Sequence, residues 1–120
     1  MEEAFVSAAK GLFSLMVDLD NVDRENAGEL EAQGANLDRL LYSWLTELLY
    51  ESGLNSYVYS DFDVDINEKD RGYLLRAVLH GESIDRRKHS IRTEVKAITY
   101  QGLKVEQTEE GCTCRFVVDV

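Results

Sequence analysis

The chain is poor in several residue types that restrict what a protein can do. Its 120 residues include no proline, two cysteines and two histidines. The absence of proline removes the most rigid turns but excludes no function. Cys112 and Cys114 point the same way from one predicted strand, too close along it for an ordinary disulfide. Cys-x-Cys is also not the paired Cys-x-x-Cys of zinc sites, so we expect buried, reduced thiols in a cytoplasmic protein.

Positive charge is scarce as well. Thirteen lysines and arginines stand against 23 aspartates and glutamates, which gives a formal net charge of −10. Direct nucleic-acid binding is therefore not expected as the main activity, because phosphate contacts dominate such binding and require a basic face. An acidic surface suits a protein partner with a basic site, or keeps the chain in solution.

Long apolar runs are also missing. No stretch approaches the ~20 apolar residues that span a bilayer. The N-terminal Met1-Glu2-Glu3 is acidic where a secretory signal requires basic residues. We therefore expect a cytoplasmic protein without membrane contact. With 44% hydrophobic residues, a chain of this length is expected to form one domain, residues 1–120, around a modest core.

Catalytic motifs are hard to find. There is no glycine-rich phosphate loop, and neither His80 nor His89 has a visible partner for metal binding or catalysis. Asp61, Asp63 and Asp65 alternate as in a calcium loop, but an isoleucine stands where an EF-hand needs glycine, and a glycine where it needs glutamate. A solvated strand face explains these aspartates better. A metal-dependent hydrolase using Asp61, Asp63 or Asp119 remains an alternative without a nucleophile–base pair to support it.

The spacing of apolar residues predicts two helices, each with a wide apolar face. We expect these helices over residues 2–19 and 37–52, and strands over residues 29–33, 57–66, 73–80, 91–100, 103–107 and 112–120. Asn36 is a suitable N-cap for the second helix, and Gly53 a suitable residue just beyond its end. Residues 18–28 read as a loop whose acids serve turn chemistry. The basic run of residues 86–88 is expected to be solvated, or to touch a phosphate or an acidic patch on a partner.

The segment 91–100 is rich in β-branched and aromatic residues, as strands are. In an extended chain one side would carry a small, mostly apolar row fit for the core: Ile91, Thr93, Val95, Ala97 and Thr99. The other side would carry Arg92, Glu94, Lys96, Ile98 and Tyr100. Glu94 and Lys96 lie side by side on it, which by itself indicates a salt bridge on a solvated face.

A family resemblance gives Glu94 and Lys96 a second, functional interpretation. The sequence Thr-Glu-Val-Lys-Ala-Ile-Thr-Tyr of residues 93–100 resembles the signature strand of the archease family. The terminal Val-Asp-Val of residues 118–120 is similar to the family's usual ending, an aspartate followed by one aliphatic residue. The resemblance continues through residues 2–5, 12–16, 44–50 and 60–62, so it covers nearly the whole chain in order.

The resemblance implies an α+β fold in which two helices pack against a strongly curved, mainly antiparallel sheet. It implies a non-enzymatic activator of the GTP-dependent tRNA-splicing RNA ligase, which promotes ligase guanylylation and multiple turnover with help of a bound divalent metal. Lys96 matches the family's activating lysine, and Glu94 could orient it. Asp119 and the α-carboxylate of Val120 match metal ligands, with calcium expected first and magnesium or manganese as alternatives.

One departure from the family pattern bears on this expectation. Family members usually begin with a strand carrying His-Thr-Ala-Asp, whose aspartate completes the metal site, and no such strand is present here. The two remaining carboxylates are few for calcium, which takes 6–8 oxygen ligands. We also expect an unpaired sheet edge, which favours homo-oligomers. The alternative function is a chaperone-like protein-interaction module without metal-dependent activation.

Overall fold

The computed structural model describes residues 1–120, except the side chains of Asn26 and Ala27. Two helices and two antiparallel sheets make up the fold, which confirms the expected α+β class. The helical elements are α1 (Glu2–Met16), the short 3₁₀ turn η1 (Leu19–Asn21) and α2 (Leu37–Asn55). The strands are β1 (Asn26–Gly34), β2 (Tyr57–Lys69), β3 (Gly72–Ser83), β4 (Ala97–Thr108) and β5 (Gly111–Asp119). Neither helix is long and apolar enough to cross a membrane.

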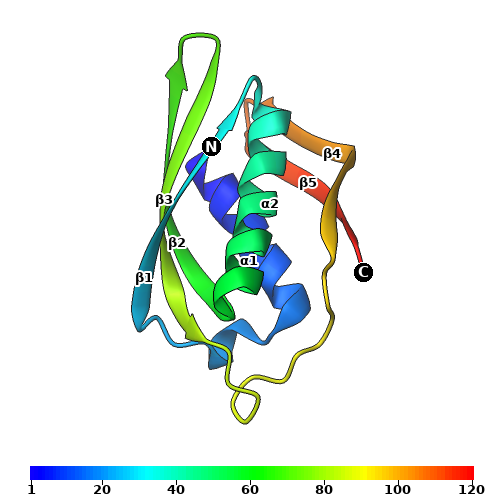
Figure 1. Cartoon of the computed structure of the whole chain (residues 1–120). Coiled ribbons are helices and arrows are strands. Elements are labelled where there is room, and N and C mark those ends of the chain that lie inside the picture. The colour runs from blue at the N-terminus through cyan, green and yellow to red at the C-terminus, as the bar shows by residue number, and fades with distance from the viewer.

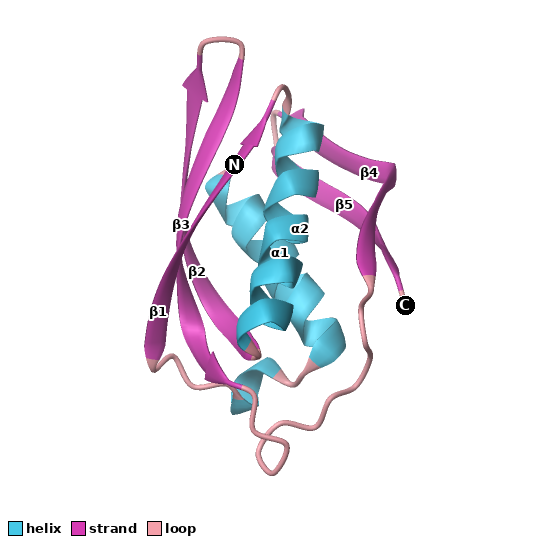
Figure 2. Ribbon diagram, viewed as in Figure 1, coloured by secondary structure: helices cyan, strands magenta, loops and turns pink.

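The two helices lie between the sheets (Figures 1 and 2). One sheet has the strand order β1-β3-β2, and the other is the β4–β5 pair. Helix α1 contacts β2 and β5, while α2 contacts β1 and β4, so each helix needs apolar side chains facing both ways. Trp44 joins the two helices directly, since its fully buried indole N–H donates to the Phe5 carbonyl at 3.0 Å. Its ring also packs edge-on against Phe62 of β2, with the centroids 5.9 Å apart.

Helix α1 ends three residues earlier than its apolar pattern predicts. Val17 is extended, with φ −146° and ψ 164°, although its side chain is fully buried. The reason lies in Asp18, whose carboxylate accepts the Asp20 N–H at 3.1 Å and caps the 3₁₀ turn. Aspartate competes with helix continuation by offering the backbone this local bond.

Helix α2 begins as predicted and ends later. The Asn36 side chain caps it by accepting the Arg39 N–H at 2.9 Å. The predicted end at residue 52, with Gly53 just beyond it, is wrong, because the helix continues to Asn55 and Ser56 takes the left-handed C-cap conformation, with φ 54°. The Ser56 N–H bonds to the Ser52 carbonyl, and the Ser52 hydroxyl donates to the Tyr57 carbonyl. These two bonds satisfy the helix end without a glycine.

The three-stranded sheet is longer than predicted at both ends. The β2–β3 ladder runs to Lys69 and Gly72, and only Asp70 and Arg71 form the turn. Polar side chains in residues 67–69 suggested a turn, but backbone pairing does not depend on them. A bulge shifts the β2 register between Tyr59 and Asp61, opposite Gly81. A Cβ on Gly81 would lie 2.7 Å from the Tyr59 Cα, so this close approach requires glycine.

The predicted strand over residues 91–100 is wrong in its first half. Strand β4 begins at Ala97, and residues 91–96 form no ladder. Of the predicted core row, Val95 is buried, whereas Ile91 is 47% exposed and Ile98, predicted to face outward, is buried. Isolated bonds fasten this segment instead of a ladder, including one from the Arg92 N–H to the Met16 carbonyl at 2.8 Å. Side-chain alternation therefore does not hold along it.

The last two strands follow the predicted pattern more closely. Gly102, predicted at a turn, lies inside β4 with φ +85°, where the register shifts between Thr99 and Lys104. Side-chain alternation predicts that one face of β5 holds Cys112, Cys114, Phe116, Val118 and Val120. The first four are half-buried, whereas Val120 is 63% exposed. The predicted reduced cysteines are free thiols, although they are half-buried rather than buried. Burial and the neighbouring Cys112 raise the pKa of Cys114 to about 12, so its thiol stays protonated at neutral pH.

Candidate functional site

Lys96 and Asp119, two of the predicted site residues, meet at the end of the two-stranded sheet. Ala97, the first residue of β4, pairs with Asp119, the last residue of β5. The Lys96 N–H donates to the Asp119 carbonyl at 2.7 Å. Antiparallel pairing therefore places the start of the signature segment beside the C-terminus, although Ala97 and Asp119 are 22 positions apart in sequence.

The Lys96 side chain is exposed, as is that of Glu94. The expected salt bridge between them is absent, since no ion pair within 4.0 Å among the described residues includes either side chain. No ion pair among the described residues therefore supports the hypothesis that Glu94 orients Lys96. An ammonium group on a flexible stem without a carboxylate partner can reach an external anion such as a phosphate.

Asp119 and Val120 offer oxygen donors at the same end of the sheet. Both residues are exposed, Val120 to 63%. Carboxylates are the ligands that hard cations such as Ca²⁺, Mg²⁺ and Mn²⁺ prefer, so the chemistry of this donor pair suits them. The number of donors is too small for calcium, which takes 6–8 oxygen ligands. Within the described residues Asp119 joins no cluster of three metal-binding side chains. Asp119 and Val120 thus form only part of a coordination shell.

A groove runs beside Lys96, and the sequence analysis missed it. It holds about 1050 Å³ and lies between the C-terminal half of α2 and the segment that leads into β4. Lys96 and Glu94 line it together with Arg86, and its apolar lining includes Tyr50, Leu54 and Ile91. Tyr50 and Leu54 are four residues apart and lie outside the buried stripe of α2, which was the signal available in the sequence.

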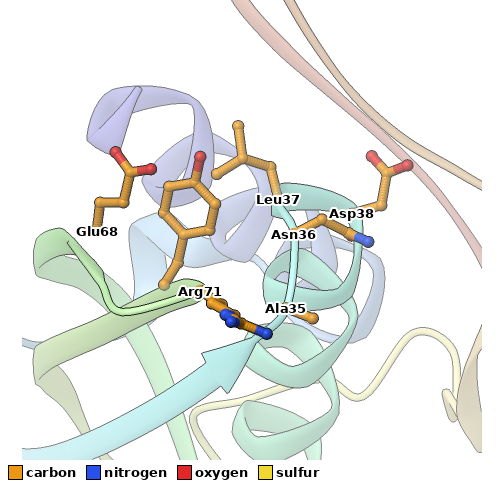
Figure 3. Close-up of a pocket in the computed structure, with 8 residues that line it drawn as sticks. Ala35, Asn36, Leu37, Asp38, Glu68 and Arg71 are labelled. Atoms are coloured by element: carbon orange, nitrogen blue, oxygen red, sulfur yellow. The ribbon is translucent and has the colours of Figure 1, made fainter.

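Another hollow lies at the opposite end of α2 (Figure 3). Ala35, Asn36, Leu37, Asp38, Glu68 and Arg71 line it, and none of them is a predicted site residue. Two of its polar side chains already serve the fold. Asn36 caps α2, and Asp38 accepts the Val105 N–H at 2.8 Å and pairs with Lys104 at 3.7 Å. We assign no function to this hollow.

Lys88 and His89 have partners that the sequence did not reveal, whereas Arg86 and Arg87 are exposed, as predicted. The Lys88 ammonium contacts Asp23 at 2.7 Å and Glu82 at 2.8 Å. The His89 side chain is fully buried, and its Nδ1 accepts the Asp85 N–H at 2.9 Å. The proton therefore belongs on Nε2, which faces the Asn21 carbonyl at 3.1 Å and Glu82 at 3.3 Å. Partners up to 68 residues away explain why sequence spacing did not reveal this cluster.

Glu82 is the centre of this cluster, which we call the Glu82 clamp: Asp23, Glu82, Lys88 and His89. Burial disfavours the Glu82 carboxylate, but hydrogen bonds from Lys88, the Asp23 N–H and His89 outweigh it and lower its pKa. Hydrogen bonds to the Asp23 and Glu82 carboxylates raise the pKa of Lys88. Asp23, Glu25 and Glu82 lie close enough to hold a cation, and the Lys88 ammonium binds two of these three carboxylates. The clamp fastens residues 84–96 to β3 and η1.

The three alternating aspartates of β2 differ in environment. Asp61 is paired with Lys10 at 3.5 Å and Arg24 at 2.5 Å, so the prediction of a solvated carboxylate is wrong for it. Asp63 pairs with His80 at 2.8 Å, which gives that histidine the partner that the sequence did not reveal. Asp65 is exposed, as expected.

Comparisons with known proteins agree on one family. The model of the Archease protein family (MTH1598/TM1083) matches residues 1–120. A Methanopyrus kandleri protein named "Protein archease" is 40% identical over 119 residues, covering 99% of this chain and 85% of the relative. A protein of the same name from Pyrococcus abyssi is 40% identical over 111 residues, covering 92% and 78%. The solution structure of Methanobacterium thermoautotrophicum protein 1598 has a TM-score of 0.87 and 33% identity, covering 99% of this chain and 84% of that one.

The Glu82 clamp leads to a prediction about pH. The folded-state pKa of Glu82 is depressed, so its contribution to stability is full above the ordinary glutamate value of 4.5 and is lost as the pH falls through the lower folded value. We expect Glu82→Gln to lower the urea midpoint at pH 7, and the difference from wild type to shrink below pH 4.5. Urea unfolding between pH 3 and 7 measures this.

Glu31→Gln is the matched control. Glu31 pairs with Arg76 at 3.1 Å, but both side chains are more than 60% exposed. An exposed pair of this kind contributes about 0–1 kcal/mol, so its removal should change the midpoint little at any pH. An equal midpoint loss in Glu82→Gln at pH 7 and pH 3 would contradict the role given to the Glu82 carboxylate.

Proposed function

This chain belongs to the archease family, and from that premise we propose that it acts in the cytoplasm as a non-enzymatic activator of a GTP-dependent tRNA-splicing RNA ligase. It promotes guanylylation of the ligase and multiple turnover. The observation that carries the proposal is the exposed, unpaired Lys96 beside Asp119, within the segment that resembles the family signature. The family model over residues 1–120 supports it.

Lys96 has the properties needed to assist a partner's active site. Its ammonium is a mobile point charge with three donors, able to engage a phosphate of the nucleotide bound to the ligase. Its backbone, in contrast, is held by the bond to Asp119. A positioned charge of this kind lowers the entropic cost of aligning the nucleotide with the ligase nucleophile. The covalent chemistry stays with the ligase.

The polar contacts of the chain support a non-enzymatic role. An enzyme that uses a side-chain nucleophile needs it within hydrogen-bond reach of a base. Through the described part of the chain, hydroxyl groups that form hydrogen bonds donate to backbone carbonyls, as Ser14 and Ser60 do. Histidine nitrogens face carboxylates and backbone groups. Asp61, a candidate for a hydrolase, is neutralised by two cations.

We propose further that Asp119 and the α-carboxylate of Val120 contribute ligands to a divalent metal in the complex with the ligase. Calcium is the first expectation, and magnesium or manganese are the alternatives. The metal would neutralise phosphate charge near Lys96. The two carboxylates supply part of a calcium shell, and further oxygen ligands such as water or groups of the ligase and its nucleotide would complete it.

A chaperone-like interaction module is the second candidate function. It is favoured by the net charge of −10 and by the groove with exposed Tyr50 and Leu54. Such a module would bind a partner without metal-dependent activation. The two functions make different demands on Lys96, since a module that only binds tolerates loss of one exposed lysine.

The first prediction of the proposal concerns this lysine. Lys96→Ala should reduce the stimulation of ligase guanylylation by about tenfold or more, because it removes a positioned charge from a reacting phosphate. A tenfold change in rate corresponds to ~1.4 kcal/mol of barrier height. Measurement is by transfer of labelled guanylate from GTP to the ligase, with Mn²⁺ present. Thermal unfolding of Lys96→Ala should match wild type.

Lys69→Ala is the control, since Lys69 is an exposed lysine at the distal end of β2. It should stimulate the ligase as wild type does. Full stimulation by Lys96→Ala would favour the interaction module. A folded wild-type chain that leaves guanylylation unchanged would sink the activator function itself.

Metal binding is tested separately from activity. In the presence of ligase and GTP, Asp119→Ala should weaken the calcium dependence of complex formation by at least tenfold. One added C-terminal glycine, which moves the α-carboxylate away, should weaken it similarly. Isothermal titration with CaCl₂ gives the affinity, and Glu106→Ala, which removes an exposed acid of β4, is the control. Unchanged calcium affinity in both altered proteins would remove Asp119 and Val120 from the ligand set.

We also propose self-association through the outer edge of β5. In the described part of the chain β5 pairs with β4 alone, so its other edge presents unpaired backbone groups. Sedimentation velocity should show a concentration-dependent dimer. Val117→Lys, which adds a charge on the exposed face of β5, should shift the protein toward monomer. A clean monomer of the wild-type chain at millimolar concentration would refute this contact.

A further inference from the structure

The groove beside Lys96 collects exposed apolar side chains from two distant parts of the chain. Tyr50 is 61% exposed and Leu54 66% exposed on α2, and Ile91 is 47% exposed on the facing segment. Large apolar side chains that gather at one groove mark an interaction site more often than the same side chains scattered singly.

The wall opposite α2 offers backbone groups as well. Within residues 91–96, the N–H groups of Arg92 and Lys96 are bonded to the Met16 and Asp119 carbonyls. Among the described residues no other hydrogen bond involves a backbone group of this segment. Backbone donors and acceptors must find partners, in water or in another chain. A strand of a partner satisfies them by adding alongside the segment, which is a recurring mode of peptide recognition.

The charges that line the groove indicate which charge a bound segment should carry. Arg86 and Lys96 line it, and neither forms an ion pair among the described residues, while Glu94 is the one acid in the lining. Two cations against one anion leave this groove positive in a chain whose net charge is −10. A segment with a carboxylate is therefore favoured here over a basic one.

We propose that the groove binds an extended segment of the ligase that carries apolar and acidic side chains and pairs with the backbone of residues 93–95. This inference rests on the proposed function for the identity of the partner and adds where that partner docks. Apolar side chains of the segment pack against Tyr50, Leu54 and Ile91. Its carboxylate meets Arg86, and Lys96 stays at the end of the groove nearest the C-terminus.

An RNA strand fits the groove less well than a protein segment. Single-stranded RNA is bound by basic channels with stacking aromatic rings, and phosphate contacts supply most of the affinity. The groove lining has one net positive charge and a mixed aliphatic and aromatic wall. The negative charge of the whole chain repels a polyanion.

The test measures the affinity of the full-length chain for the purified ligase by fluorescence anisotropy. Leu54→Glu and Arg86→Ser should each weaken binding at least fivefold, because one places a charge in the apolar wall and the other removes the cation facing the carboxylate. Leu15→Glu and Arg115→Ser are matched controls. Both residues are exposed and lie outside the groove, and both variants should bind as wild type does.

Amide hydrogen exchange then separates strand addition from other modes of docking. The amides of Thr93, Glu94 and Val95 should exchange at least tenfold more slowly in the complex. An affinity loss in Leu54→Glu without protection of these amides would overturn strand addition in favour of a helix lying in the groove.

Guanylylation measured in the same samples keeps the two claims distinguishable. Wild-type stimulation with unchanged binding by both groove variants would overturn the groove while leaving the activator function standing. A wild-type chain that neither binds nor stimulates the ligase would overturn both. RNA oligonucleotides that bind the chain alone and lose affinity in Leu54→Glu would overturn the choice of a protein segment.

Discussion

The position of the candidate site depends on how the chain crosses from the three-stranded sheet to the two-stranded one. Residues 84–96 make this crossing without a ladder of their own. The Glu82 clamp holds the beginning of the crossing, where Lys88 joins two carboxylates and His89 bonds to backbone of two segments. The Arg92 N–H holds the middle and the Lys96 N–H the end. Each fastening point joins segments far apart in sequence, so Lys96 is placed by tertiary contacts and not by local propensity.

The second sheet depends on the same helices that cover the first. Helix α1 lies between β2 and β5, so its apolar face serves both layers. Phe5, Phe13 and Trp44 fill the space between them and are fully buried. Burial of such side chains contributes about 1.5–3 kcal/mol each. The β4–β5 pair, which would be marginal alone, is stabilised by packing half of each strand onto this shared core. The end of β5, and with it Asp119, is therefore fixed relative to Lys96.

Local signals in the sequence were enough for the helices, the β2–β3 hairpin and the alternation of β5. The Asn36 cap and the alternation of β5 depend only on neighbouring residues; the cap is confirmed, and the alternation holds through Val118. The prediction failed where a distant bond decides the outcome. Residues 91–96 have strand propensity, yet single bonds to Met16 and Asp119 replace the ladder. The end of α2 was missed for a local reason: the Ser56 N–H and the Ser52 hydroxyl bond to nearby carbonyls, so the helix ends without glycine.

The sequence pointed to individual residues of the candidate site but did not reveal the groove beside them. The resemblance marked Lys96, Asp119 and Val120, and the structure brings the backbones of the first two together. The groove has no short motif, since α2 supplies one wall and the crossing segment the other. Likewise, nothing near Lys88 in the sequence showed that Asp23, 65 residues away, would neutralise it.

Two lysines of the crossing segment show how the same chemistry can serve the fold or the function. Lys88 contacts two carboxylates within 3 Å, and these contacts raise its pKa and keep it charged. The two carboxylates neutralise the Lys88 charge, so Lys88 attracts an external anion only weakly. Lys96 has no carboxylate within 4.0 Å among the described residues, and its backbone is nevertheless fixed. The chain has a net charge of −10, yet no surface carboxylate pairs with this anchored lysine beside the groove. Such an exposed pair would add only a small stabilisation. Lys96 is therefore available to an external anion, which under the proposed function is a phosphate held by the ligase.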